Sequence, residues 1–234
     1  MSYYFIIGLN KTGTSSIRDA LEWSLQFPYS NPIFHKMHKE NKISYNERRI
    51  ENIFSFTDFL IKDYNLRLFK DRPWNTGCYK ELNEKYNNSK FILTIRDEKE
   101  WWTSVQNWLS LKAIWTKNLD EELKIKTLNF KIKQYNAHFN CQTLNQNDYL
   151  NYYNTYNNSV IEYFKHKPNF YLFHLNKDFN WKNIQKIINL DEETMRDNIV
   201  KSLEERGREY LKNINLNGKI KDWEFLKSNR NKLT

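Results

Sequence analysis

Short apolar segments and longer segments with helical spacing follow one another along this chain. Four short segments, rich in aliphatic and aromatic residues, predict strands over residues 5–7, 66–69, 91–95 and 170–175. The segments between and after them repeat apolar residues every three or four positions, which is typical of amphipathic helices. The expected helices cover residues 14–27, 48–62, 79–86, 98–115, 120–139, 149–165, 181–188 and 192–211. Strands that alternate with helices predict a three-layer α/β fold, in which helices flank a central parallel sheet.

A glycine-containing turn follows the first expected strand. The chain has only five glycines, and two of them, Gly8 and Gly13, fall in this turn, which indicates a turn with special backbone requirements. Thr14, Ser15 and Ser16 then offer hydroxyl groups where the next helix is expected to begin. Free backbone N–H groups and the positive end of the helix dipole favour an anion at such a place. The segment therefore predicts an anion-binding site.

The position of the lysine distinguishes between two kinds of anion-binding loop. Nucleoside triphosphatases have a lysine directly after the second glycine, whereas Lys11 lies two residues before Gly13. The order of residues 11–15, Lys-Thr-Gly-Thr-Ser, instead resembles the 5′-phosphosulfate loop of the sulfotransferases, although Asn10 stands where that family usually has proline or serine. The resemblance implies a P-loop-like fold and the sulfuryl donor 3′-phosphoadenosine 5′-phosphosulfate (PAPS). The donor-binding residues that it implies are Lys11, Thr12, Gly13, Thr14, Ser15 and Ser16.

A second motif lies at the end of the third expected strand. Arg96 follows this strand, and Ser104 comes eight residues later on the following helix. An arginine there offers a forked, permanently charged group to a phosphate, and a serine two helical turns along adds a hydroxyl from the same side. The spacing resembles the 3′-phosphate motif of the sulfotransferases. The resemblance thus implies that Arg96 and Ser104 bind the 3′-phosphate of PAPS, with Lys11 on the oxygen that bridges phosphorus and sulfur.

The general base that takes the acceptor's proton has two favoured candidates, Asp71 and His38. Asp71 directly follows the second expected strand, at the sheet edge where parallel strands place their sites, and its segment resembles sulfotransferase-like proteins with an aspartate before a proline. His38 lies in a loop segment with His35 and Glu40, which are chemically suitable for the same role. The choice between Asp71 and His38 stays open from the sequence alone. No metal is required by this scheme.

Length and composition fit a cytoplasmic enzyme of one domain. We expect a single sulfotransferase-like domain over residues 1–234, with a helical C-terminal region from about residue 190 to 234, in which Arg206 and Arg208 are candidates to reach the 3′-phosphate. No run approaches the roughly 18 apolar residues of a membrane span, and no signal peptide is evident. Cys78 and Cys141 are far apart and outside metal-ligand spacing, which favours a reduced setting.

Two other classes of function compete with sulfuryl transfer. A P-loop nucleotide kinase or NTPase is disfavoured by the position of Lys11. The net charge of +9 favours anionic ligands, but the charges are too dispersed along the chain to favour nucleic acid as a partner. A non-catalytic protein with the sulfotransferase fold remains an alternative. The acceptor is of unknown class, because a sugar, a peptide, a lipid and a phenol all present a suitable oxygen, and the oligomeric state is not predicted.

Overall fold

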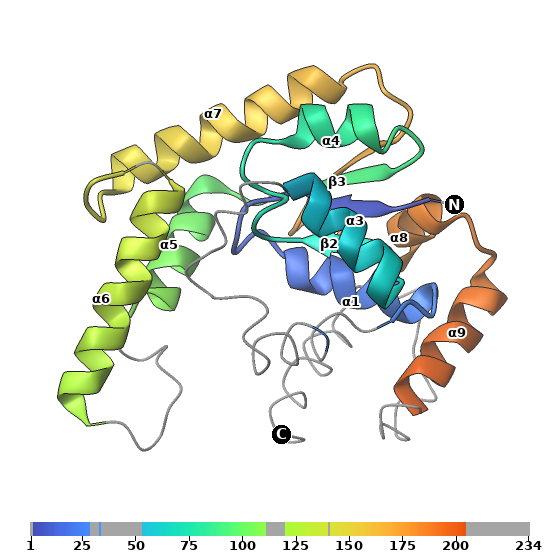
Figure 1. The fold of residues 1–234 in the computed structure, drawn as a ribbon, viewed down its shortest axis with the longest axis horizontal. Helices are drawn as coiled ribbons and strands as arrows, with labels where there is room; N and C mark the ends of the chain where they lie inside the picture. The colour runs from blue at the N-terminus through green and yellow to red at the C-terminus, as the bar shows by residue number, and fades with distance from the viewer. Residues whose placement is uncertain (1, 29–32, 34–52, 111–119, 140, 205–234) are drawn as a thin grey trace.

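The computed structural model describes residues 2–28, 33, 53–110, 120–139 and 141–204 of the chain. Within these ranges four parallel strands form one sheet in the order β2-β1-β3-β4 (Figure 1). The strands are β1 (Tyr4–Ile6), β2 (Leu68–Lys70), β3 (Lys90–Ile95) and β4 (Phe170–His174). In the register of the sheet, Phe5 of β1 lies opposite Phe69 of β2 and Phe91 of β3. The predicted parallel α/β sheet is confirmed.

Helices connect the strands and flank the sheet. They are α1 (Thr14–Ser24), α3 (Ile53–Tyr64), α4 (Tyr79–Lys85), α5 (Glu98–Trp108), α6 (Glu121–His138), α7 (Gln146–Phe164), α8 (Trp181–Ile188) and α9 (Glu192–Glu204). The expected end of α1 at residue 27 is wrong, because α1 ends at Ser24 and the N–H of its C-cap residue Leu25 bonds to Leu21 O. Likewise α5 ends at Trp108, with Leu109 as its cap. Residues 48–52, 111–115 and 205–211 of the expected helices lie outside the described residues.

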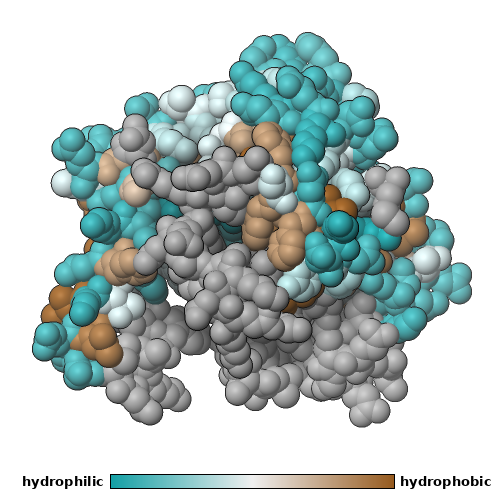
Figure 2. Space-filling view, in the orientation of Figure 1, coloured by the Kyte–Doolittle hydropathy of each residue, from teal (hydrophilic) through white to brown (hydrophobic). Residues whose placement is uncertain are grey.

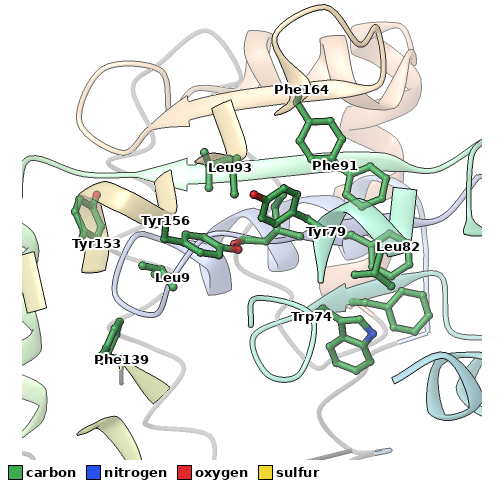
Figure 3. Close-up of a cluster of buried hydrophobic side chains, with 14 of the residues drawn as sticks. Leu9, Trp74, Tyr79, Leu82, Phe91, Leu93, Phe139, Tyr153, Tyr156 and Phe164 are labelled. Atoms are coloured by element: carbon green, nitrogen blue, oxygen red, sulfur yellow. The ribbon is translucent and has the colours of Figure 1, made fainter. Parts of the chain in front are cut away.

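Alternate residues of β1 enter two separate hydrophobic cores, one on each face of the sheet. Phe5 and Ile7 belong to the core that includes buried side chains of α3, α4, α5 and α7. Tyr4 and Ile6 belong to the other core, which includes side chains of α1, α8 and α9. The ring of Phe5 stacks against those of Phe69 and Phe91, and Figure 3 shows part of this first core. Each such buried side chain stabilises the fold by roughly 1.5–3 kcal/mol relative to an exposed one. The three-layer arrangement is confirmed.

The strand order places the candidate site. The chain passes from β1 to β2 on one side, and then crosses to β3 on the other side of β1. The connections that leave β1 and β3 therefore run in opposite directions, and ligands of open α/β sheets bind at such a switch point, beyond the carboxyl ends of the strands. Residues 7–13, Asp71 and Arg96 all follow carboxyl ends of strands at this edge.

One helix is an exception to the packing pattern. None of the residues of α6 is fully buried, and Leu123, Ile125 and Phe130 are more than two-fifths exposed. Apolar surface is visible over this helix at the lower left of Figure 2. In Figure 1, α6 lies beside α5, at the end of the sheet to which the loop after β1 points. Ile132 and Tyr135 of this helix pack against the first core, but neither is fully buried.

Candidate active site

The loop between β1 and α1 has two residues with left-handed backbone, Lys11 (φ 74°) and Gly13 (φ 96°). Gly13 is the N-cap of α1 and makes no side-chain cap bond, and its carbonyl accepts from the N–H groups of Ser16 and Ile17 at 2.9 and 3.1 Å. The helix begins at Thr14, where the hydroxyl residues were expected to start it, and the left-handed glycine before them turns the chain into the helix. A Cβ at this position would lie 2.5 Å from Leu175 Cδ1.

The inner edge of the loop is fixed to β3. Gly8 packs so closely on Thr94 that a Cβ would lie 2.8 and 2.9 Å from the main-chain O and N of Thr94. Thr12 is fully buried, and its hydroxyl donates to Leu9 O at 2.5 Å and shares a hydrogen bond with the Thr94 hydroxyl at 2.7 Å. The Thr12 hydroxyl is thus occupied within the protein.

Side chains from three other elements hold the outer part of the same loop. The indole N–H of Trp101 donates to Asn10 O at 3.0 Å, and the hydroxyl of Tyr156 donates to Ile7 O at 2.7 Å. The side-chain amide of Asn75 donates to Asn10 Oδ1 at 3.3 Å. These residues come from α5, α7 and the segment after β2. The loop is therefore held in one conformation from several sides, as a binding site needs.

Asp71 lies next to the first turn of α1. Its Oδ1 accepts a hydrogen bond from the Thr14 hydroxyl at 3.1 Å, and its Oδ2 pairs with Lys70, which also donates to the Ser15 hydroxyl at 3.3 Å. Burial alone raises the pKa of Asp71, but the charge of Lys70 and the hydrogen bonds from Lys70 and Thr14 outweigh it and leave the pKa below its ordinary value. Asp71 has a left-handed backbone (φ 60°) and is ionised at neutral pH.

Arg96 lies at the end of β3, beside the loop. Its main-chain N–H and C=O both bond to the Tyr153 hydroxyl at 2.8 Å, and its Nε donates to Glu100 Oε2 at 3.1 Å. Hydrogen bonds from Asn176 and then Arg96 lower the pKa of Glu100. Among the described residues, no carboxylate binds the two terminal amino groups of the guanidinium. Ser104 is half-buried one turn after Glu100 on α5.

Trp108 and Lys131 lie near the loop, although no sequence motif indicated them as site residues. The ammonium group of Lys11 lies 4.7 Å from the centroid of the Trp108 ring, and that of Lys131 lies 4.5 Å from the same centroid. Trp108 is the last residue of α5 and is 36% exposed, whereas Lys131 comes from α6. Lys11, Trp108 and Lys131 are far apart in the sequence, so no sequence pattern predicts that they lie together.

The inner face of α6 is bonded to the loop and to the segment after β2. Asn10 Nδ2 donates to the hydroxyl of Tyr135 at 3.2 Å. Arg72 donates from Nε to His138 Nδ1 at 2.9 Å, and from a terminal amino group to Gln134 O at 2.8 Å. Polar contacts therefore dock this helix on the candidate site, in addition to the packing of Ile132 and Tyr135 against the first core.

The structure brings together most of the residues expected from the sequence. Residues 11–16 and Asp71 form one contiguous group, and Arg96 and Ser104 lie on the neighbouring strand end and helix. His38, with His35 and Glu40, lies outside the described residues, as do Arg206 and Arg208. In the described part of the chain, no three His, Cys, Asp or Glu side chains are grouped to hold a metal ion. No helix in that part is long and apolar enough to cross a membrane.

A comparison with known families gives a match over most of the chain. A family model described as a sulfotransferase domain matches residues 5–193, which include the loop after β1, Arg96 and every described strand except the first residue of β1. None of the curated proteins matches the chain.

Proposed function

This chain belongs to the sulfotransferase domain family, and on that premise we propose that it transfers a sulfuryl group from PAPS to a hydroxyl or amine acceptor. The observation that carries the proposal is the placement of two cationic strand-end segments on adjacent parallel strands. The Lys11 loop follows β1 and Arg96 follows β3, at the switch point of the sheet. A donor with phosphates at both its 5′ and its 3′ positions needs two such anion sites.

Each segment has a distinct role in this proposal. The N–H groups at the start of α1, with the hydroxyls of Ser15 and Ser16, bind the 5′-phosphosulfate, while the Thr14 hydroxyl donates to Asp71. Arg96, held through Nε by Glu100, presents its terminal amino groups to the 3′-phosphate, and Ser104 adds a hydroxyl. ATP lacks the 3′-phosphate and leaves this second site unused.

In the transfer step to a hydroxyl acceptor, the acceptor oxygen attacks sulfur in line with the bond that breaks. A new S–O bond forms, the bond from sulfur to the bridging oxygen breaks, and that oxygen leaves with 3′-phosphoadenosine 5′-phosphate (PAP). Lys11 stabilises the charge that develops on the bridging oxygen. The acceptor's proton goes to Asp71 or to His38. Asp71 is ionised, and although its lowered pKa makes it a weak base, the acceptor's proton becomes strongly acidic as the new S–O bond forms.

Isothermal titration with PAP, beside ATP with Mg²⁺, tests the donor site. We expect PAP to bind, and Lys11→Ala and Arg96→Ala each to weaken binding by at least about tenfold, because each removes a charged hydrogen-bond donor. Lys99→Ala, an exposed lysine on α5, is the matched control and is expected to bind PAP normally. Binding of ATP in preference to PAP would overturn the proposal in favour of a nucleotide kinase.

A further inference from the structure

Lys131 differs from an ordinary surface lysine of a polar helix. It is half-buried, its ammonium group lies 4.5 Å from the centroid of the Trp108 ring, and burial lowers its pKa. No carboxylate of the described residues pairs with it. By contrast, Lys124 of the same helix pairs with Glu121 at 2.7 Å, in the usual surface arrangement. Partial burial of a cation without a carboxylate partner costs free energy, and the binding of an anion beside the cation offsets this cost.

The position of Lys131 is fixed by its neighbours on α6. Tyr135 and His138 lie one and two turns further along the same face of the helix, since residues three, four and seven apart share a face. Tyr135 accepts a hydrogen bond from Asn10 of the anion loop, and His138 accepts one from Arg72. The hydrogen bonds therefore hold this face of α6, with Lys131 on it, against the site.

Two ammonium groups share one aromatic ring at this position. Lys11 and Lys131 both lie over Trp108, so their separation cannot exceed the sum of their distances to its centroid. The two ammonium groups therefore lie within about 9 Å of each other, which is comparable with the screening length of about 8 Å at physiological ionic strength, so the repulsion between them is weak. The negative face of the indole offsets part of this repulsion. An anion bound nearby would offset the rest, because its negative charge attracts both ammonium groups.

We propose that Lys131 is a second cation of the donor site and binds the non-bridging oxygens of the sulfuryl group that is transferred. This inference rests on the proposed function, in which Lys11 takes the bridging oxygen. The two lysines then contact different parts of the donor. Lys11 touches an atom that remains with PAP, whereas Lys131 touches only the group that leaves PAP. Trp108 positions both ammonium groups before the donor arrives.

The comparison of PAPS with PAP tests this division, because PAP lacks the sulfuryl group. Affinities for both ligands are measured by titration, without acceptor, for the wild type and for Lys131→Met, which keeps the apolar stem of the side chain. We expect Lys131→Met to weaken PAPS binding by about 10- to 100-fold, the usual effect of losing a charged hydrogen bond, and PAP binding by less than about threefold. Lys131→Arg, which keeps the charge, is expected to retain most of the PAPS affinity.

Lys133→Met provides the matched control, because Lys133 lies on the same helix and is exposed. It is expected to bind both ligands like the wild type, and thermal unfolding checks that each variant is folded. Equal losses of PAPS and PAP affinity in Lys131→Met, or no loss of either, would overturn the assignment while the donor site stands. Failure of the wild type to bind either ligand would overturn the proposed function itself.

Discussion

The hydroxyl of Thr14 donates a hydrogen bond to Asp71 Oδ1 across 3.1 Å, between residues 57 positions apart in the chain. The bond joins the first residue of α1 to the residue that follows β2. Lys70 strengthens the same junction, since it pairs with Asp71 and donates to the Ser15 hydroxyl. The anion loop and the candidate base are therefore parts of one hydrogen-bonded unit, and a change in one is expected to affect the other.

Asp71→Asn tests this unit through the dependence of stability on pH. The pKa of Asp71 is lowered in the folded protein from a reference value of 3.8, so its charge stabilises the fold above that pH. At pH 7 the substitution is expected to lower the free energy of unfolding by about 1–3 kcal/mol, the cost of losing a charged hydrogen bond. The wild type loses this contribution as the pH falls below 3.8 through the lower folded pKa, so the two proteins converge there.

Urea unfolding at pH 7 and at pH values below 4 measures the difference. Asp63→Asn is the control, because Asp63 is an exposed residue of α3 and is expected to leave stability unchanged. A difference between wild type and Asp71→Asn that stays constant with pH would show that the charge of Asp71 does not stabilise the fold.

Glu100→Gln is expected to strengthen the binding of PAP. Glu100 holds Arg96 through Nε, and glutamine keeps an oxygen for that bond but removes a negative charge beside the proposed 3′-phosphate position. Because Glu100 is exposed, the gain is modest, about two- to fivefold at low salt, and it shrinks in 0.5 M salt. Isothermal titration of PAP at the two salt concentrations measures it. Weaker binding by Glu100→Gln would mean that the charge of Glu100 is needed to hold Arg96 in place.

The part of the site that lies close together in the sequence could be predicted. An apolar run, two glycines and a group of hydroxyl residues indicated β1, the turn and the start of α1, and each lies where it was expected. The detail of the cap could not be predicted, because the hydroxyl residues and the left-handed Gly13 are both suitable for a helix start. Only the path of the backbone decides between them.

The contribution of α6 could not be predicted from the sequence. None of its residues is fully buried, so no apolar stripe indicates which face meets the rest of the protein. Several of its contacts are single polar pairs, such as Asn10 with Tyr135, which are 125 positions apart. Such pairs depend on how the whole chain packs. The meeting of Lys11 and Lys131 on Trp108 has the same origin.

Gly8→Ala is expected to destabilise the fold by about 3 kcal/mol or more, because the added methyl group would enter the space of Thr94 in β3. The close main-chain neighbours belong to a central strand and cannot move aside. Gly77→Ala is the matched comparison. Gly77 has a left-handed backbone (φ 95°), but a Cβ added there would have no neighbouring atom within 4 Å. The substitution is expected to cost only about 1–2 kcal/mol, for a side chain in the left-handed conformation. Chemical unfolding of both variants compares the two costs, and a larger loss for Gly77→Ala would contradict the prediction.

Thr12→Val separates a structural role of the Thr12 hydroxyl from a donor-binding role. The hydroxyl is buried and bonds to Leu9 O and to the Thr94 hydroxyl. Valine has nearly the same shape but no hydroxyl, so Leu9 O and the Thr94 hydroxyl each lose a hydrogen-bond partner. We expect the free energy of unfolding to fall by about 1–3 kcal/mol, while the affinity for PAP changes by less than about threefold. Thr12→Ser keeps the hydroxyl and is expected to lose less stability. Urea unfolding and PAP titration of the two variants give both quantities. A loss of PAP affinity without a loss of stability would assign the hydroxyl to the donor instead.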